Sequence, residues 1–126
     1  MRKEQRRRIR IELALPAWIY IENKRFSTET KNLSLKGVLL NLKRGRVKLI
    51  KGEKYKIIIS PGGGVEIKVI SKFVDQTQRG ASFDFIKMDE VSFRNLFNII
   101  RLYAPDPDLV KEELTNPAFD VKDLDL

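Results

Sequence analysis

The stretch Val65-Glu66-Ile67-Lys68-Val69-Ile70-Ser71-Lys72-Phe73 gives the clearest structural signal in the sequence. Its apolar side chains largely alternate with charged ones, and this period of two is typical of a β-strand with one buried face. Residues 79–86 alternate in the same way, and the glycine-rich run at 61–64 predicts a hairpin turn before Val65. These segments indicate a mainly β fold.

Other segments complete this prediction. Strands are expected over 13–21, 25–32, 37–42 and 55–60, with a short one over 47–50. Short strands at such regular spacing are typical of a barrel or a sandwich. Asp89 suits a helix N-cap, and after it come apolar residues at helical spacing, Phe93, Leu96, Phe97, Ile100 and Tyr103. This spacing predicts a helix that lays one face over the β structure and ends before Pro105.

Composition excludes several classes of protein. A chain of 126 residues favours one domain, and it contains no cysteine and no histidine. Disulfides and thiolate metal sites are therefore excluded, and the commonest general base is missing. No apolar run approaches the roughly 18 residues that a membrane-spanning helix needs, and the basic start lacks the apolar core of a secretory signal. We therefore expect a cytoplasmic protein.

Charge divides the chain into three parts. Residues 1–103 carry 23 basic and 10 acidic side chains, a net charge of +13, whereas 104–126 carry two basic and seven acidic ones, a net charge of −5. We expect a flexible basic arm over 1–12, a β-barrel with its helix over 13–103, and an acidic tail over 104–126. The tail should hang loose apart from one short helix near 108–114.

Two short motifs bear on function. The first is Arg6-Arg7-Arg8-Ile9-Arg10, which places Arg6 and Arg10 in an RxxxR spacing. The second is Asn32-Leu33-Ser34-Leu35-Lys36-Gly37, which fits [D/N]xSxxG. In this order, and about twenty residues apart, they resemble the signature of PilZ domains, which bind the bacterial second messenger cyclic di-GMP. The resemblance spans roughly 5–103, and Arg79-Gly80-Ala81-Ser82-Phe83 resembles the last strand of that family.

The resemblance implies both a fold and a site. The fold would be a six-stranded antiparallel β-barrel that follows an arginine-bearing arm and precedes a C-terminal α-helix. The site would bind cyclic di-GMP without catalysis and without a metal or other cofactor. Its ligand-binding residues would be Arg6, Arg10, Asn32, Ser34 and Gly37, with Arg7 and Arg8 in support.

These residue types suit a ligand of two guanines and two phosphates. An arginine fork can meet the O6 and N7 acceptors of guanine together, and it binds phosphate oxygens with charge assistance. Asn32 can both donate to and accept from a base edge, and Ser34 adds a hydroxyl. Gly37 has no Cβ, so its backbone can approach a ligand or turn sharply. Ligand binding would then order the self-repelling arm and present a new surface to a downstream protein.

Other interpretations remain open from sequence. A basic terminal run alone is typical of a solvated tail, and Asn, Ser and Gly together are typical of a turn. Only Lys36 is available to activate Ser34 as a nucleophile, so we do not expect an enzyme. A small basic β-barrel could instead bind single-stranded RNA or DNA through a charged groove and stacking aromatic rings. A third possibility is a scaffold that has lost its ligand, against which the intact motifs argue.

Overall fold

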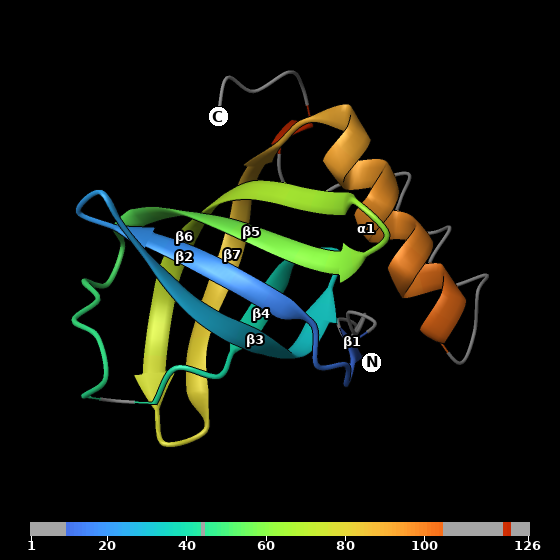
Figure 1. The fold of residues 1–126 in the computed structure, drawn as a ribbon. Helices are drawn as coiled ribbons and strands as arrows, with labels where there is room; N and C mark the ends of the chain where they lie inside the picture. Colours follow the sequence, from blue (N-terminus) through green and yellow to red (C-terminus); the bar gives the residue numbers. More distant parts are fainter. Residues whose placement is uncertain (1–9, 44, 105–119, 122–126) are drawn as a thin grey trace, which may run out of the picture.

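The computed structural model describes residues 10–43, 45–104 and 120–121. Within these residues, eight strands and one helix follow each other in sequence (Figure 1). Their bounds are β1 Arg10–Ile11, β2 Pro16–Ile21, β3 Lys24–Ser34, β4 Gly37–Leu40, β5 Lys54–Gly62, β6 Val65–Thr77, β7 Gly80–Met88, α1 Glu90–Tyr103 and β8 Asp120–Val121.

Six of these strands close into an antiparallel barrel, as the resemblance to the PilZ family implied. The strands neighbour one another in the order β3-β2-β5-β6-β7-β4, and β4 pairs back onto β3. The long strand β3 makes this closure possible because its first half pairs with β2 and its second half pairs with β4. The pairing passes from β2 to β4 between Glu29 and Thr30, and the register with β4 shifts between Thr30 and Asn32.

The alternation in the sequence fills the barrel. Side chains that point inward from the six strands form one apolar core, in which Ile19, Ile57, Ile67 and Phe83 are almost wholly buried. The rings of Phe73 and Tyr55 pack against the ring of Phe83. Most outward residues of the same strands are polar or half-buried, and Val74 of β6 is an exposed apolar exception.

The helix α1 begins where the sequence predicted. Asp89 accepts a hydrogen bond from the backbone N–H of Ser92 at 2.7 Å, which satisfies a free donor of the first turn. Leu96 and Ile100 are buried, whereas Phe93 and Phe97 are half-buried. The prediction that Tyr103 belongs to the packed face was wrong. Its side chain is 54% exposed because the helix packs mainly on β6 and its last turn extends beyond that strand (Figure 1).

A second prediction also failed. No strand forms over 47–50, where Val47 and Leu49 pack half-buried against the core and the backbone N–H of Ile50 bonds the Tyr55 hydroxyl. The barrel is already closed by β3 and β4, so this segment finds no free strand edge to join.

Both ends of the chain contribute a short strand. Arg10 and Ile11 of the predicted flexible arm form β1, which pairs with β3 at Ser34 and Leu33, and Ile11 is buried. The predicted helix near 108–114 lies outside the described residues. Within the expected loose tail, Asp120–Val121 form β8, which pairs in parallel with Lys87 and Met88 of β7. The sequence analysis anticipated neither strand, because two residues carry no periodic signal. No helix in the described part of the chain is long and apolar enough to cross a membrane.

Candidate functional site

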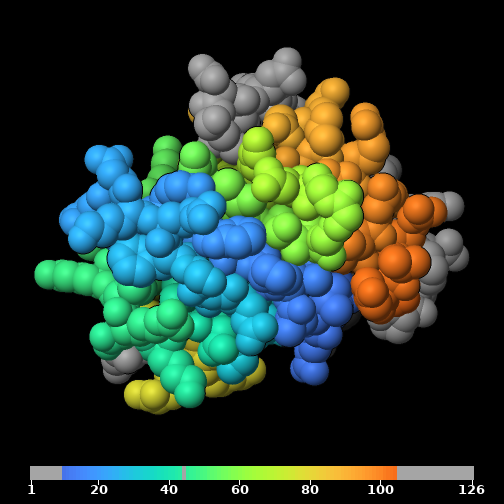
Figure 2. All heavy atoms as spheres, viewed as in Figure 1, coloured from blue at the N-terminus to red at the C-terminus, as the bar shows by residue number. Residues whose placement is uncertain are grey.

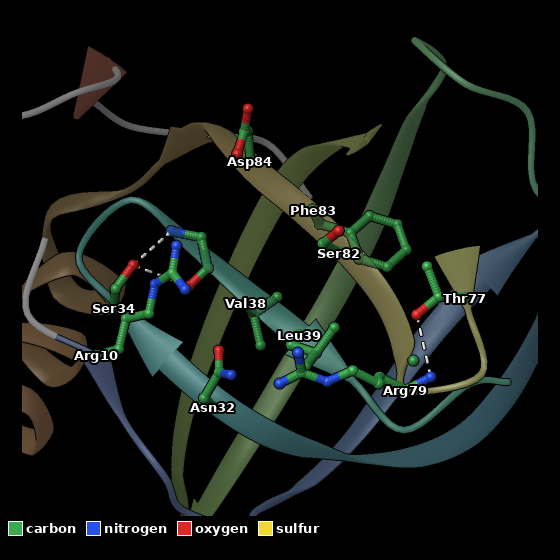
Figure 3. Close-up of a pocket in the computed structure, with 12 residues that line it drawn as sticks. Arg10, Asn32, Ser34, Val38, Leu39, Thr77, Arg79, Ser82, Phe83 and Asp84 are labelled. Atoms are coloured by element: carbon green, nitrogen blue, oxygen red, sulfur yellow. Dashed lines mark hydrogen bonds between the residues drawn. The ribbon is translucent and has the colours of Figure 1, made fainter. Parts of the chain in front are cut away.

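A polar hollow lies on the outside of the barrel, where β4 and β7 meet the ends of β1 and β3 and the turn between β6 and β7 (Figure 3). Its volume is about 280 Å³. Residues paired across neighbouring strands share one face, so Asn32, Leu39 and Ser82 form a row along its floor. The lining residues are Arg10, Asn32, Ser34, Gly37, Val38, Leu39, Thr77, Arg79, Gly80, Ser82, Phe83 and Asp84.

Ser34 builds the loop between β3 and β4. Its side chain is buried, and its hydroxyl oxygen accepts hydrogen bonds from the backbone N–H groups of Lys36 and Gly37, both at 3.1 Å. The same hydroxyl donates to the carbonyl of Gly37 at 3.3 Å. A hydroxyl has one donor and two acceptor positions, and these bonds use all of them. Ser34 therefore contributes to the hollow by fixing the conformation of the β3–β4 loop, and its hydroxyl has no free hydrogen-bonding position for a ligand.

Gly37 and Gly80 let β4 and β7 approach each other closely. A Cβ atom at Gly37 would overlap the carbonyl oxygen of Phe83, and one at Gly80 would overlap that of Leu40. Gly80 also has a φ of +144°, a conformation that residues with a side chain rarely adopt. The structure thus gives Gly37 a further role beyond the two considered from sequence, which is to admit the backbone of β7.

Two arginines reach the hollow from opposite ends (Figure 3). Arg10 extends from β1 beside Ser34, while Arg79 extends from the β6–β7 turn over Leu39 toward Asn32. Both side chains are exposed, and neither forms a salt bridge with a carboxylate of the described residues. Each guanidinium is a planar fork of hydrogen-bond donors. The hollow therefore offers two donor forks with Asn32 between them.

The backbone around Arg79 is held in place by two hydrogen bonds. The Thr77 hydroxyl accepts from the backbone N–H of Arg79 at 3.0 Å, within the turn. The ammonium group of Lys31 on β3 donates to the carbonyl of Arg79 at 2.7 Å. Because one bond lies within the turn and the other joins it to β3, Arg79 starts from a fixed position at the rim.

The charge of the hollow favours an anionic ligand. Its lining includes two arginines and one acidic residue, Asp84, which lies opposite Gly37 on β7 and away from Arg79 in Figure 3. Excess positive charge at a concave surface raises the local concentration of anions. Among the described residues there is no group of three or more histidine, cysteine, aspartate or glutamate side chains placed to hold a metal ion.

The structure brings together four residues of the predicted site. Arg10, Asn32, Ser34 and Gly37 all line the hollow, although Arg10 is 22 positions before Asn32 in the chain. Arg6, Arg7 and Arg8, which the sequence analysis also assigned to the site, lie outside the described residues.

The other wall of the hollow was not predicted from the sequence. Thr77, Arg79, Ser82 and Asp84 lie near the β6–β7 turn and on β7. From the sequence, Arg79, Ser82 and Asp84 were expected only as parts of a strand, and Thr77 was assigned no role. The segment Arg79–Phe83 had been noted for its resemblance to a last strand. The pairing of β7 with β4 could have indicated that Ser82 faces the same side as Asn32, whereas Arg79 lies in the turn before β7 and outside this pairing.

The chain matches a known protein-family model. The family model described as PilZ domain matches residues 2–102, which is most of the chain. The match includes both motifs and every residue that lines the hollow. No protein with a curated description matches the chain.

Solved structures of low sequence identity share the fold. The inhibitor of motility MotI/DgrA of Bacillus subtilis superimposes with a TM-score of 0.66 at 16% identity, covering 92% of this chain and 55% of its own. The PilZ domain of Escherichia coli YcgR with c-di-GMP gives 0.61 at 17% identity, covering 90% of this chain and 99% of that domain. YcgR of E. coli in complex with c-di-GMP gives 0.60 at 21% identity, covering 88% and 48%. The chain spans about half the length of MotI/DgrA and of this longer YcgR chain.

Proposed function

The chain belongs to the PilZ domain family, whose members are noncatalytic receptors for cyclic di-GMP, and we propose that it binds this ligand in the hollow between Arg10 and Arg79. The observation that carries the proposal is the meeting of four predicted residues at one polar hollow, Arg10, Asn32, Ser34 and Gly37. The YcgR structures with c-di-GMP, which share this fold, add support.

The two arginines suit the two halves of the ligand. In this proposal Arg10 meets the O6 and N7 atoms of one guanine with its donor fork. Arg79, at the other end of the hollow, meets the second guanine or a phosphate. Asn32 lies between them and can both donate to and accept from a base edge. Ser34 and Gly37 contribute through the β3–β4 loop that they form.

The basic residues that precede β1 complete the proposed site. Because β1 is paired with β3, Arg10 is fixed beside the hollow, and Arg6 is four residues away along the chain. Four extended residues span at most about 14 Å, which lets Arg6 contact the same ligand. The two phosphates would neutralise part of the charge on Arg6, Arg7 and Arg8. We propose that this orders the preceding residues and creates a surface that a downstream protein recognises.

Calorimetric titration of the full chain tests this function against the nucleic-acid alternative. Cyclic di-GMP and a single-stranded RNA of 12 nucleotides are titrated separately at two salt concentrations. We expect saturable binding of cyclic di-GMP that persists at the higher salt concentration. Binding to RNA through charge alone would fall steeply with salt. Saturable RNA binding with no heat from cyclic di-GMP would refute the proposal.

A further inference from the structure

The outward side chains of β2, β5 and β6 form a basic and aromatic surface, which we call the Trp18 face. Strand pairing arranges them in two rows, and Arg25 of β3 lies opposite Tyr20 at one side. β2 and β5 lie in the foreground of Figures 1 and 2. The face consists of Trp18, Ile58 and Lys68 in the first row, Tyr20, Lys56 and Ile70 in the second, and Arg25.

Two cations of this face are held by aromatic rings. The guanidinium of Arg25 lies 5.2 Å from the centre of the Trp18 ring, and the ammonium of Lys56 lies 4.4 Å from the centre of the Tyr20 ring. Neither cation has a carboxylate partner among the described residues, whereas Lys68 pairs with Glu66 at 3.9 Å. The rings thus position two positive charges that are available to an acidic group.

This arrangement favours carboxylates over nucleic-acid bases. A base would have to stack on the ring faces, which Arg25 and Lys56 already cover. A carboxylate can bind either cation without disturbing the ring beneath it. Ile58 and Ile70, both half-buried, lie in the same rows and offer apolar contact. The face therefore suits a polypeptide that carries acidic and apolar side chains together.

Residues 105–126 of the chain have this composition. They carry seven acidic and two basic side chains, a net charge of −5 beside a strongly basic barrel. The acidic side chains are those of Asp106, Asp108, Glu112, Glu113, Asp120, Asp123 and Asp125, and the apolar ones are those of Leu109, Val110, Leu114, Phe119, Val121, Leu124 and Leu126.

The strand β8 anchors this segment close to the Trp18 face. Asp120 pairs with Lys87 on one edge of β7, and Lys87 pairs on its other edge with Ile70 of the face. Neighbouring strands are about 4.8 Å apart, so β8 holds the segment roughly 10 Å from Ile70. Because β8 is attached so close to the face, the acidic residues on either side of it have a high effective concentration there.

We propose that the acidic segment 105–126 docks on the Trp18 face of its own barrel. Its carboxylates bind Arg25 and Lys56, and its leucine side chains pack on Ile58 and Ile70. The barrel order places β2 and β5 across from β7 and β4, which line the hollow. The docked segment therefore covers the wall opposite the ligand site and leaves that site open, so the inference stands independently of the proposed ligand.

The single tryptophan of the chain makes this docking measurable, because all indole fluorescence comes from Trp18. The test compares the full-length wild type with a variant in which Asp106, Asp108, Asp123 and Asp125 become Asn and Glu112 and Glu113 become Gln. At low salt we expect acrylamide to quench Trp18 about twofold more strongly in the variant, since exposed charges hold a tethered segment only moderately tightly. In 1 M NaCl, where the Debye length is about 3 Å, the two proteins should become alike.

Matched lysine variants separate docking from a general charge effect. Lys56→Gln removes a cation of the face without touching Trp18, and it should raise quenching in the wild type but add little to the neutralised variant. Lys48→Gln removes an exposed cation of the loop before β5 and should leave the acrylamide quenching of Trp18 unchanged.

Three results would overturn the proposal. The first is equal quenching of the wild type and the neutralised variant at low salt. The second is protection of Trp18 by a single-stranded oligonucleotide combined with indifference to the tail charges, which would assign the face to nucleic acid. The third is protection that is lost on dilution, which would mean that the acidic segment of a second copy is the occupant.

Discussion

At the scale of single residues, Arg10 belongs both to a sequence motif and to the lining of the hollow. It belongs to the RxxxR motif, its backbone is fixed by pairing with Ser34, and its guanidinium lines the hollow without a carboxylate partner among the described residues. Its side chain is exposed, so it contributes little to the core. A substitution of Arg10 should therefore weaken ligand binding and leave the fold intact.

Arg10→Ala and Arg79→Ala should each weaken cyclic di-GMP binding by roughly ten- to hundredfold. A bidentate arginine–guanine contact is worth about 1–3 kcal/mol, and about 1.4 kcal/mol is tenfold in affinity. Arg94→Ala, which removes an exposed arginine of α1 outside the hollow, is the matched control and should bind as the wild type does. Calorimetric titration measures the Kd of each variant for cyclic di-GMP. An unchanged Kd in both Arg10→Ala and Arg79→Ala would reject the hollow as the binding site.

Gly37 tests the close approach of β4 and β7. A methyl group there meets the backbone of Phe83, which cannot move aside as a flexible side chain would. We expect Gly37→Ala to destabilise the fold by about 1–3 kcal/mol. At roughly 4 °C per kcal/mol for a chain of this size, the Tm should fall by several degrees in a thermal melt. A Tm equal to that of the wild type would show that β4 accommodates a Cβ.

At the scale of elements, α1 packs on the barrel through a small part of its surface. Leu96 is wholly buried, whereas Leu102 on the same helix is 73% exposed. We expect Leu96→Ala to lower the free energy of unfolding by about 2–5 kcal/mol and Leu102→Ala to change it by less than about 0.5 kcal/mol. Urea unfolding followed by circular dichroism measures both, and equal losses would contradict this packing.

The strand β1 pairs two described residues of the basic arm, Arg10 and Ile11, with β3. We expect slower amide exchange at Ile11 than over residues 2–9 in the free protein, because β1 is paired with β3. Addition of cyclic di-GMP should slow exchange over 6–10 if the ligand orders the arm. If the amide exchange rates of residues 6–10 stay unchanged at saturating cyclic di-GMP, the proposed ordering of the arm is wrong. That result would not exclude binding at the hollow.

Periodicity in the sequence predicted most elements, and the two short motifs predicted part of the site. β6, β7 and α1 follow from alternation, helical spacing and the cap at Asp89, all of which are local signals. Arg79 could not be found in this way, since it reaches Asn32 only after β7 pairs with β4 and β4 pairs with β3. Tyr103 had the helical spacing of a buried residue, but its position depends on where the barrel beneath the helix ends.

At the scale of the whole molecule, the barrel separates two charged walls. One wall carries the hollow between Arg10 and Arg79, and the opposite wall carries the Trp18 face with Arg25 and Lys56. Both could attract an anion, so affinity alone does not say where cyclic di-GMP binds. We propose that the ligand binds at the wall formed by β1, β3, β4 and β7.

The most direct test is a two-dimensional ¹H–¹⁵N NMR titration of the full chain with cyclic di-GMP. We predict that the largest chemical-shift changes fall at the backbone amides of Gly37, Gly80 and Ser82 and at the side-chain amide of Asn32, all of which line the hollow. The indole N–H of Trp18 and the amides of β2 and β5 should barely move. Large chemical-shift changes at the indole N–H of Trp18, with unchanged shifts at Gly37 and Asn32, would contradict ligand binding in the hollow.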